Sequence, residues 1–132
     1  MIGDLRVQFA RENLAIRLTD ENLRVRSMAA TALGKVGGDE TSLQALVQMI
    51  AENADADPIV RHGGIMGLVG IRNRKLLQRL QHHPVPSVRL AAVVALRKLQ
   101  RSEVSVFLDD SDERVVTEAA RTIHDVPLRN AF

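Results

Sequence analysis

The sequence predicts an all-α protein built as a solenoid of stacked helix pairs. The main observation is a stretch that occurs four times, with copies anchored on Arg26, Arg61, Arg89 and Val116. In each copy valine precedes the anchor, alanine or glycine follows three positions later, and leucine or isoleucine follows seven positions later. These positions are four residues apart and share one face of a helix. One such apolar face cannot bury itself, so each copy needs the next to pack against.

Two further features support helix pairs. The residue six positions after the anchor is small in three copies and threonine in the fourth, and small residues let a neighbouring helix approach closely. The anchors lie 35, 28 and 27 residues apart, enough for two short helices and two turns. Asn22, Asp57 and Asp112 stand four positions before their anchors, where they are expected to cap helices. Pro58 and Pro86 fall in the first helical turn, where proline is tolerated.

The N-terminal part of the chain is expected to hold three helices. A leading amphipathic helix over 4–19 lies too close to the first anchor to be a complete repeat, so we take it as a half-repeat or cap. Its apolar positions include Leu5, Phe9, Leu14 and Ile16. The first full repeat, about 20–54, has a helix over 22–35 and then a second helix. The apolar stripe of this second helix consists of Leu43, Leu46, Val47 and Ile50.

The second repeat, about 55–82, begins with a glycine-rich helix over 61–70. Four glycines lie in this helix, and each costs about 1 kcal/mol relative to alanine. Their spacing fits neither a P-loop nor a dinucleotide fingerprint, and no strand precedes them. We interpret Gly64 and Gly67 as the small-residue positions of the repeat, with a local hinge as the alternative. The partner helix, about 72–82, is expected to bury Leu76, Leu77 and Leu80.

The last two repeats are shorter. The third, about 83–109, has a helix that ends near Leu99 and a short second helix over 102–108. The apolar positions of the short helix are Val104, Phe107 and Leu108. The fourth, about 110–132, has a helix over 112–124 and no partner helix, so we expect it to be incomplete. The whole chain, 1–132, is then a single repeat domain, which we expect to be a fragment of a longer protein.

The composition argues against several classes of site. The chain has no cysteine, which excludes disulfides and thiolate metal sites. Its histidines form no metal-binding or catalytic motif, so we expect no metal, no cofactor, no catalytic residue and no enzymatic activity. No apolar run approaches the ~18 residues of a membrane span, and we expect no signal peptide. The compartment is left open: cytoplasmic for a self-contained protein, exported or periplasmic for a segment of a larger exported one.

Charge is unevenly distributed along the chain. Residues 1–53 carry a net charge of −1, residues 54–101 of +7 and residues 102–132 of −4, which sum to the overall +2. Arg72, Lys75 and Arg79 fall on one side of the expected 72–82 helix, with His82 at its end. We take these four as candidate contacts for an anionic partner, either an acidic protein segment or nucleic-acid phosphates. The alternative is a solvated helix face. No aromatic residue accompanies the basic ones, which argues against single-stranded nucleic acid as the partner.

The repeated stretch resembles HEAT-like repeats, in particular the short bacterial kind also found in phycobilisome lyase-related proteins. Their pattern is D-x-x-x-x-V-R-x-x-A-x-x-A-L, and the copies follow it over about 20–125. The first copy matches in full with Asp20, Val25, Arg26, Ala29, Ala32 and Leu33, and the second matches with Asp55, Val60, Arg61 and Leu68 and has glycines for alanines. The third matches with Val88, Arg89, Ala92, Ala95 and Leu96 but has His83 for the aspartate, and the fourth keeps Asp110, Val115 and Ala119 but has Val116 for the arginine.

The resemblance implies a right-handed superhelix of about four HEAT-like helix pairs, whose second helices line the concave face. It also implies a structural ladder that ties loops and neighbouring repeats together. The ladder residues are Asp20, Arg26, Asp55, Arg61 and Arg89. Residues 88–124 also resemble HEAT segments of large exported bacterial proteins that join a dehydrogenase-like propeller to a c-type cytochrome, which implies a spacer or docking role.

These resemblances imply a non-catalytic scaffold whose concave face meets a protein partner or neighbouring domains of the same chain. The rival interpretation is nucleic-acid binding through a basic groove around residues 72–101. A third is a chromophore-lyase-type accessory protein, which fold analogy alone supports.

Overall fold

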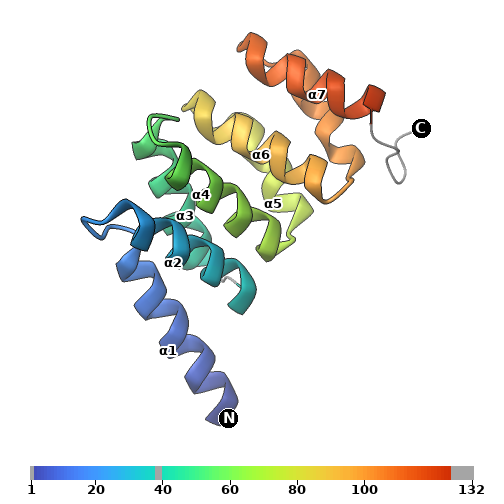
Figure 1. Ribbon diagram of the computed structural model, residues 1–132. Coiled ribbons are helices and arrows are strands. Elements are labelled where there is room, and N and C mark those ends of the chain that lie inside the picture. Colours follow the sequence, from blue (N-terminus) through green and yellow to red (C-terminus); the bar gives the residue numbers. More distant parts are fainter. Residues whose placement is uncertain (1, 38–39, 126–132) are drawn as a thin grey trace. The chain divides into compact units, whose positions relative to one another are not determined.

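A computed structural model describes the backbone of residues 2–37 and 40–125 and the side chains of residues 5–37 and 40–125 (Figure 1). Every regular element within these ranges is a helix, so the all-α prediction is confirmed. The α-helices are α1 (Ile2–Arg17), α2 (Leu23–Val36), α3 (Glu40–Asn53), α4 (Pro58–Ile71), α5 (Arg74–Arg79), α6 (Pro86–Lys98) and α7 (Glu113–Asp125). Two 3₁₀ helices, η1 (Leu80–His82) and η2 (Ser102–Asp109), complete the set.

The chain forms two compact units, residues 1–71 and residues 72–132. The first contains α1 to α4 and the second α5 to α7 with both 3₁₀ helices. The superhelix over the whole chain and the extent of the predicted domain both stay predictions. Residues 126–132, the end of the expected incomplete fourth repeat, lie outside the described residues.

Side chains cap the first helices of the repeats at the predicted positions. The Oδ1 atom of Asn22 accepts hydrogen bonds from the backbone N–H groups at the start of α2, at 2.9 and 3.3 Å. Asp57 does the same for α4, at 2.8 and 3.0 Å. Pro86 opens α6, where the cap position is held by Val85 and no side chain caps the helix. Asp112 accepts the N–H of Arg114 at 2.8 Å at the start of α7.

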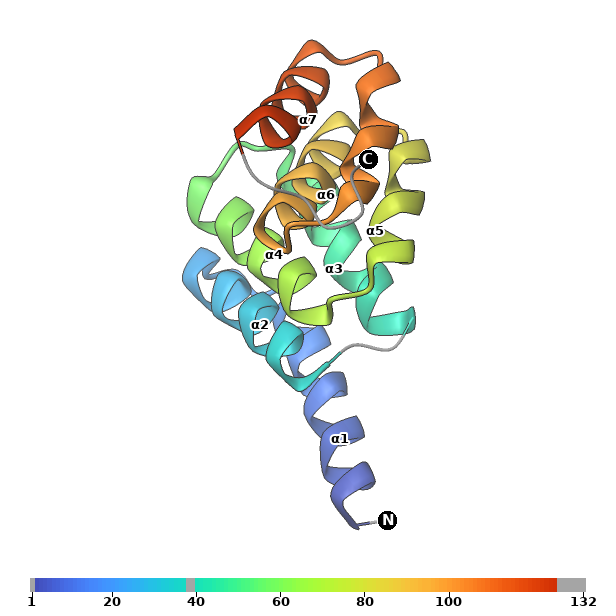
Figure 2. The ribbon, with the colours of Figure 1, turned by 90° about the vertical axis from the view of Figure 1, so that its right-hand side faces the viewer.

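In the first unit α2 lies along α4, as Figures 1 and 2 both show. Glycine makes this close approach feasible. A Cβ added to Gly70 would lie 2.6 Å from the carbonyl carbon of Gly34, and one added to Gly67 would lie 2.8 Å from the carbonyl oxygen of Ala30. A Cβ on Gly64 would lie 2.6 Å from Ile50. The contacts therefore support the small-residue interpretation, and α4 is one uninterrupted helix.

A left-handed turn follows the first helix in three successive repeats. Gly37, Arg72 and Gln100 occupy the same repeat position, eleven residues after their anchors, and have φ angles of 85°, 58° and 55°. Such a turn commonly ends a helix and favours glycine, which has no Cβ to clash. The sequence pattern hides this regularity because only the first copy has glycine there.

In the second unit the centre is α6, whose stripe of Val88, Ala92 and Leu96 is fully buried. Phe107 of η2 and Val115 of α7 are fully buried in the same unit. One helix prediction is corrected here. The helix predicted over 72–82 begins only at Arg74, because Asn73 caps it by accepting the N–H of Leu76, and its end tightens into η1 ahead of Pro84. The short helix predicted over 102–108 is present as the 3₁₀ helix η2, whose serines and valines are weak α-helix formers.

Candidate functional site

The anchor arginines each reach the residue six positions upstream. The Arg26 Nε–H donates to the carbonyl oxygen of Asp20, and the Arg61 Nε lies 3.6 Å from the Oδ1 of Asp55. Arg89 donates from Nη1 to the carbonyl oxygen of His83 at 2.8 Å. We propose that these contacts hold the turn ahead of each first helix, as the ladder hypothesis expects.

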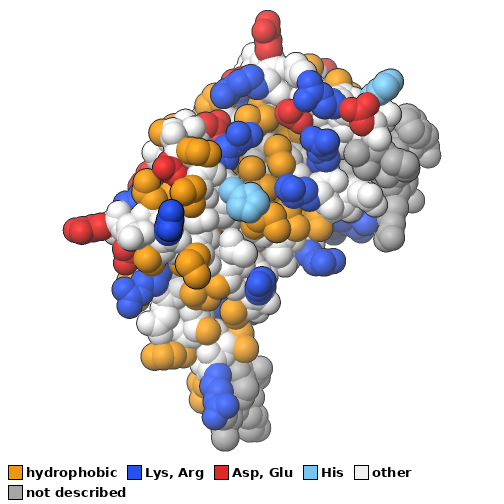
Figure 3. Space-filling view, viewed as in Figure 1, with side chains coloured by type: hydrophobic (Ala, Val, Ile, Leu, Met, Phe, Trp, Pro, Cys, Tyr) orange, Lys and Arg blue, Asp and Glu red, His pale blue; other side chains and the backbone are white. Residues whose placement is uncertain are grey.

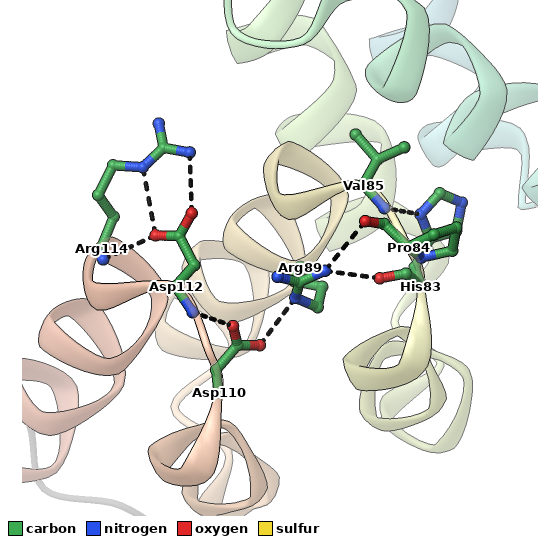
Figure 4. Close-up of polar contacts among 7 residues, drawn as sticks. All are labelled: His83, Pro84, Val85, Arg89, Asp110, Asp112 and Arg114. Carbon is green, nitrogen blue, oxygen red and sulfur yellow. Dashed lines mark hydrogen bonds and ion pairs between the residues drawn. The ribbon is translucent and has the colours of Figure 1, made fainter.

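Arg89 also links two successive repeats (Figure 4). Its Nε–H donates to the Oδ2 of Asp110 at 2.8 Å, and its Nη1 makes a second, longer contact of 3.3 Å to the carbonyl oxygen of Pro84. The Arg89 side chain is 10% exposed and that of Asp110 5% exposed. The fourth repeat has Val116 in place of an arginine. Its Asp110 therefore pairs with the arginine of the preceding repeat, which makes this the most buried contact of the ladder.

His83 replaces the aspartate of the third repeat and also makes the aspartate's hydrogen bond. Asp20 and Asp110 each accept, through Oδ1, the N–H of the residue two positions on, at 2.9 and 2.8 Å. The Nδ1 atom of His83 accepts the N–H of Val85 at 3.1 Å (Figure 4). Because that N–H is a donor, Nδ1 must carry no proton in this arrangement.

Acidic residues of the C-terminal segment neutralise part of the basic segment. Besides the Arg89–Asp110 pair, Arg97 lies 3.7 Å from Glu118. The carboxylate of Glu103 lies 3.5 Å from the Nε of Arg74 and 3.7 Å from the Nε of Arg101. The +7 and −4 segments read from the sequence thus meet inside the second unit. The field of the basic segment is weaker than its sequence charge suggests.

The four predicted site residues take no part in these ion pairs. The side chains of Arg72, Lys75, Arg79 and His82 are exposed, and none makes an ion pair with another residue of the described chain. Lys75 and Arg79 lie four residues apart on α5 and so share a side of it. The sequence predicted that Arg72 would lie on the same helix. In the structure it lies instead in the left-handed turn before α5.

Two pockets divide the remaining candidates. Arg72 lines a pocket of about 270 Å³ with Arg74, Leu99 and Arg101. His82 lines another, of about 520 Å³, beside the buried Arg89 pair. Neither of these two pockets contains all four predicted residues, and they share none of them. That Arg74 and Arg101 line this pocket could not be predicted from the sequence, because it depends on how α5, α6 and η2 pack.

Two carboxylates at the ends of α7 have lowered pKa values. The side-chain hydrogen bonds from Arg114, at 3.3 Å, hold the pKa of Asp112 below its usual value, with backbone N–H donation as a further cause. Hydrogen bonding to His124 lowers the pKa of Asp125 in the same way. Both are local contacts at the ends of α7 and stand outside the two pockets.

A second surface is apolar and lies on α1. Leu5, Phe9 and Ile16 are 72%, 69% and 67% exposed. Figure 3 shows hydrophobic side chains gathered along this helix, at the lower end of the view. The described residues hold no group of acidic and histidine side chains that could bind a metal ion. No helix in the described ranges is long and apolar enough to cross a membrane.

Comparison with known proteins identifies one family. A family model described as HEAT repeats matches residues 1–68, just over half of the chain. No curated protein matches the chain, and no solved structure does. The match covers α1, α2, α3 and most of α4.

Proposed function

The chain belongs to the HEAT-repeat family, and from that premise we propose that it is a non-catalytic scaffold that binds an acidic protein segment. Repeats of this family generally serve as scaffolds for protein interactions. The surface that we assign to the partner consists of Arg72, Lys75 and Arg79, with His82 at its edge. Neighbouring domains of the same chain could supply the acidic segment as well as a separate protein.

One observation carries this proposal. The basic segment 54–101 pairs its arginines at positions 74, 89, 97 and 101 with carboxylates of the following segment. Arg72, Lys75 and Arg79 remain exposed, without an ion pair to another described residue. Exposed cations that a fold does not neutralise attract anionic partners and raise their association rate. Their charge is therefore free for an intermolecular contact.

Nucleic acid is the rival partner. The chain contains three phenylalanines and no tyrosine or tryptophan, and Phe107, in the same unit, is fully buried. Among the described residues of that unit no exposed aromatic ring is available for base stacking, which disfavours single strands. Binding of a DNA duplex through its phosphates alone is tested by the experiment below. The phycobilisome-lyase and dehydrogenase–cytochrome resemblances stay predictions about the wider protein context.

The test compares two triple variants of equal charge. The first is Arg72→Glu, Lys75→Glu, Arg79→Glu; the control is Arg6→Glu, Arg24→Glu, Lys35→Glu, which changes three exposed residues of the first unit. The probes are a deca-glutamate peptide and a duplex DNA of about twenty base pairs, titrated at low salt. We expect the first variant to weaken peptide binding by at least about tenfold more than the control, because exposed charge contacts contribute up to ~1 kcal/mol each.

Salt dependence separates the partner classes. Duplex binding releases condensed counterions, so its logarithmic slope is roughly −0.9 per phosphate contact. A steep slope with strong duplex binding and weak peptide binding would replace the scaffold proposal by the nucleic-acid one. Equal losses in both variants would show that net charge, rather than this surface, controls binding.

A further inference from the structure

Three arginines surround one pocket of the second unit. Arg72, Arg74 and Arg101 line it together with Leu99, and its volume is about 270 Å³. Arg72 and Arg74 flank the N-cap of α5, and Arg101 stands in the short connection between α6 and η2. The pocket therefore draws its cations from two loops that are far apart in the sequence.

The positive charge of this pocket is only partly compensated. Among the described residues, Glu103 is the one carboxylate within ion-pair distance of these arginines, at 3.5 Å from Arg74 and 3.7 Å from Arg101. Within the second unit, α6 ends just before Leu99, and a helix C-terminus carries about half a negative charge. Glu103 and this helix end together offset only about half of the positive charge of the three arginines. A net positive charge therefore remains for a ligand.

A hydrogen-bond donor at the pocket also lacks an acceptor. The Nε atom of Arg101 and the Oε2 atom of Glu103 are buried and have no hydrogen-bond partner within the described chain. The 3.7 Å between them is too long for a hydrogen bond. Buried polar groups are normally satisfied, so an unmet donor calls for an explanation. Because this Nε is buried and faces the Glu103 carboxylate, an oxyanion in the pocket would be met by the terminal guanidinium nitrogens of Arg101 rather than by Nε.

The backbone conformation at Arg72 gives no reason for an arginine at this position. Its φ of 58° is a left-handed conformation in which the equivalent position of the first repeat has Gly37. Glycine suits that conformation better than any residue with a Cβ. The Arg72 side chain makes no hydrogen bond or ion pair with another described residue. No contact within the described chain therefore accounts for an arginine there.

We propose that Arg72, Arg74 and Arg101 form a binding site for a small tetrahedral oxyanion of the phosphate and sulfate class. Guanidinium groups bind such oxygens through paired, charge-assisted hydrogen bonds in a planar fork. The site goes beyond the scaffold role, because a free oxyanion needs no partner protein. Lys75 and Arg79 do not line the pocket and are not part of it.

The experiment titrates the full chain with sodium phosphate against sodium chloride of equal ionic strength, and follows binding by amide chemical shifts. The decisive variant is Arg72→Gly, which removes the cation and relieves the left-handed backbone. We expect it to weaken phosphate binding by about tenfold, as for the loss of one charge-assisted contact. Its thermal midpoint should be equal to or higher than that of the wild type.

Two controls isolate the pocket. Gln100→Gly makes the same backbone change at the same repeat position without removing a charge, and should bind phosphate as the wild type does. Lys98→Gln removes an exposed charge of α6 that does not line the pocket, and should also bind normally. The proposal is overturned if wild type shows no saturable phosphate shift, if Arg72→Gly binds as well as wild type, or if Lys98→Gln loses as much as Arg72→Gly. If the acidic-peptide test fails while phosphate binds as expected, the proposed scaffold function is refuted and the oxyanion site stands.

Discussion

Replacing Arg89 by alanine should cost far more stability than the same change at Arg61, although the two occupy one repeat position. Arg89→Ala leaves the carboxylate of Asp110, 5% exposed, without its cation. It also removes the donors to two backbone carbonyls, at 2.8 and 3.3 Å. Truncating one partner of a buried ion pair costs ~3–5 kcal/mol, because an uncompensated charge stays behind.

Arg61 provides the matched comparison. Its side chain is 43% exposed, and its Nε lies 3.6 Å from Asp55 rather than within hydrogen-bond distance. Pairs with that exposure are screened by solvent and contribute ~0–1 kcal/mol. Arg61→Ala should therefore lower the free energy of unfolding by about 1 kcal/mol or less.

Urea denaturation followed by far-ultraviolet circular dichroism measures both values, with the slope on urea checked for each variant. Asp110→Ala and the double variant Arg89→Ala, Asp110→Ala complete a cycle. The double variant should lose less than the sum of the single losses, since the second change removes the stranded partner. Equal losses at Arg89 and Arg61, or a loss below about 1 kcal/mol at Arg89, would refute the argument that Arg89 and Asp110 form a buried, coupled link.

Three further outcomes follow from the contacts described above. Gly70→Ala should destabilise the chain by about 1–3 kcal/mol in the same assay, because its Cβ would meet the Gly34 backbone at 2.6 Å; a gain of about 1 kcal/mol, as helix propensity alone predicts, would contradict this. His83→Asp should be as stable as the wild type or more so, whereas His83→Ala should lose about 1 kcal/mol because the N–H of Val85 loses its acceptor; equal stability of the two variants would show that this hydrogen bond does not stabilise the turn. Arg114→Ala should raise the pKa of Asp112 toward 3.8, measured by carboxyl chemical shifts; because the folded pKa is lowered, the stabilisation that this carboxylate provides is present above its ordinary value and lost as the pH falls below it. An unchanged pKa in that variant would show that the N–H donors alone cause the shift.

The helices were predictable because their signals are local. The valine, alanine and leucine of each copy recur at four-residue spacing, and Val60, Ala92 and Leu96 are buried as that spacing requires. The six-residue separation between an anchor arginine and its upstream partner is also short, so the contact of Arg26 with Asp20 follows from one turn and one helix start.

What the sequence could not supply depends on packing between elements. The Arg97–Glu118 pair joins α6 to α7 across 21 residues of chain, and nothing in the local pattern selects it. The left-handed turns at Arg72 and Gln100 contain no glycine at the left-handed position, so the sequence gives no signal for them. Predicting that Arg72 shares a helix face with Lys75 and Arg79 was wrong for this reason: the cap at Asn73 delays the helix by two residues.

Mapping the contact surface of an acidic peptide tests the central claim most directly, since it locates binding without any substitution. The full ¹⁵N-labelled chain is titrated with a deca-glutamate peptide at low salt, and amide chemical shifts are followed residue by residue. The account predicts saturable shifts concentrated from Arg72 to His82 and reduced by added salt. Shifts concentrated on α1 or α2, or none anywhere in the described chain, would contradict the claim that the unpaired basic side chains form the binding surface.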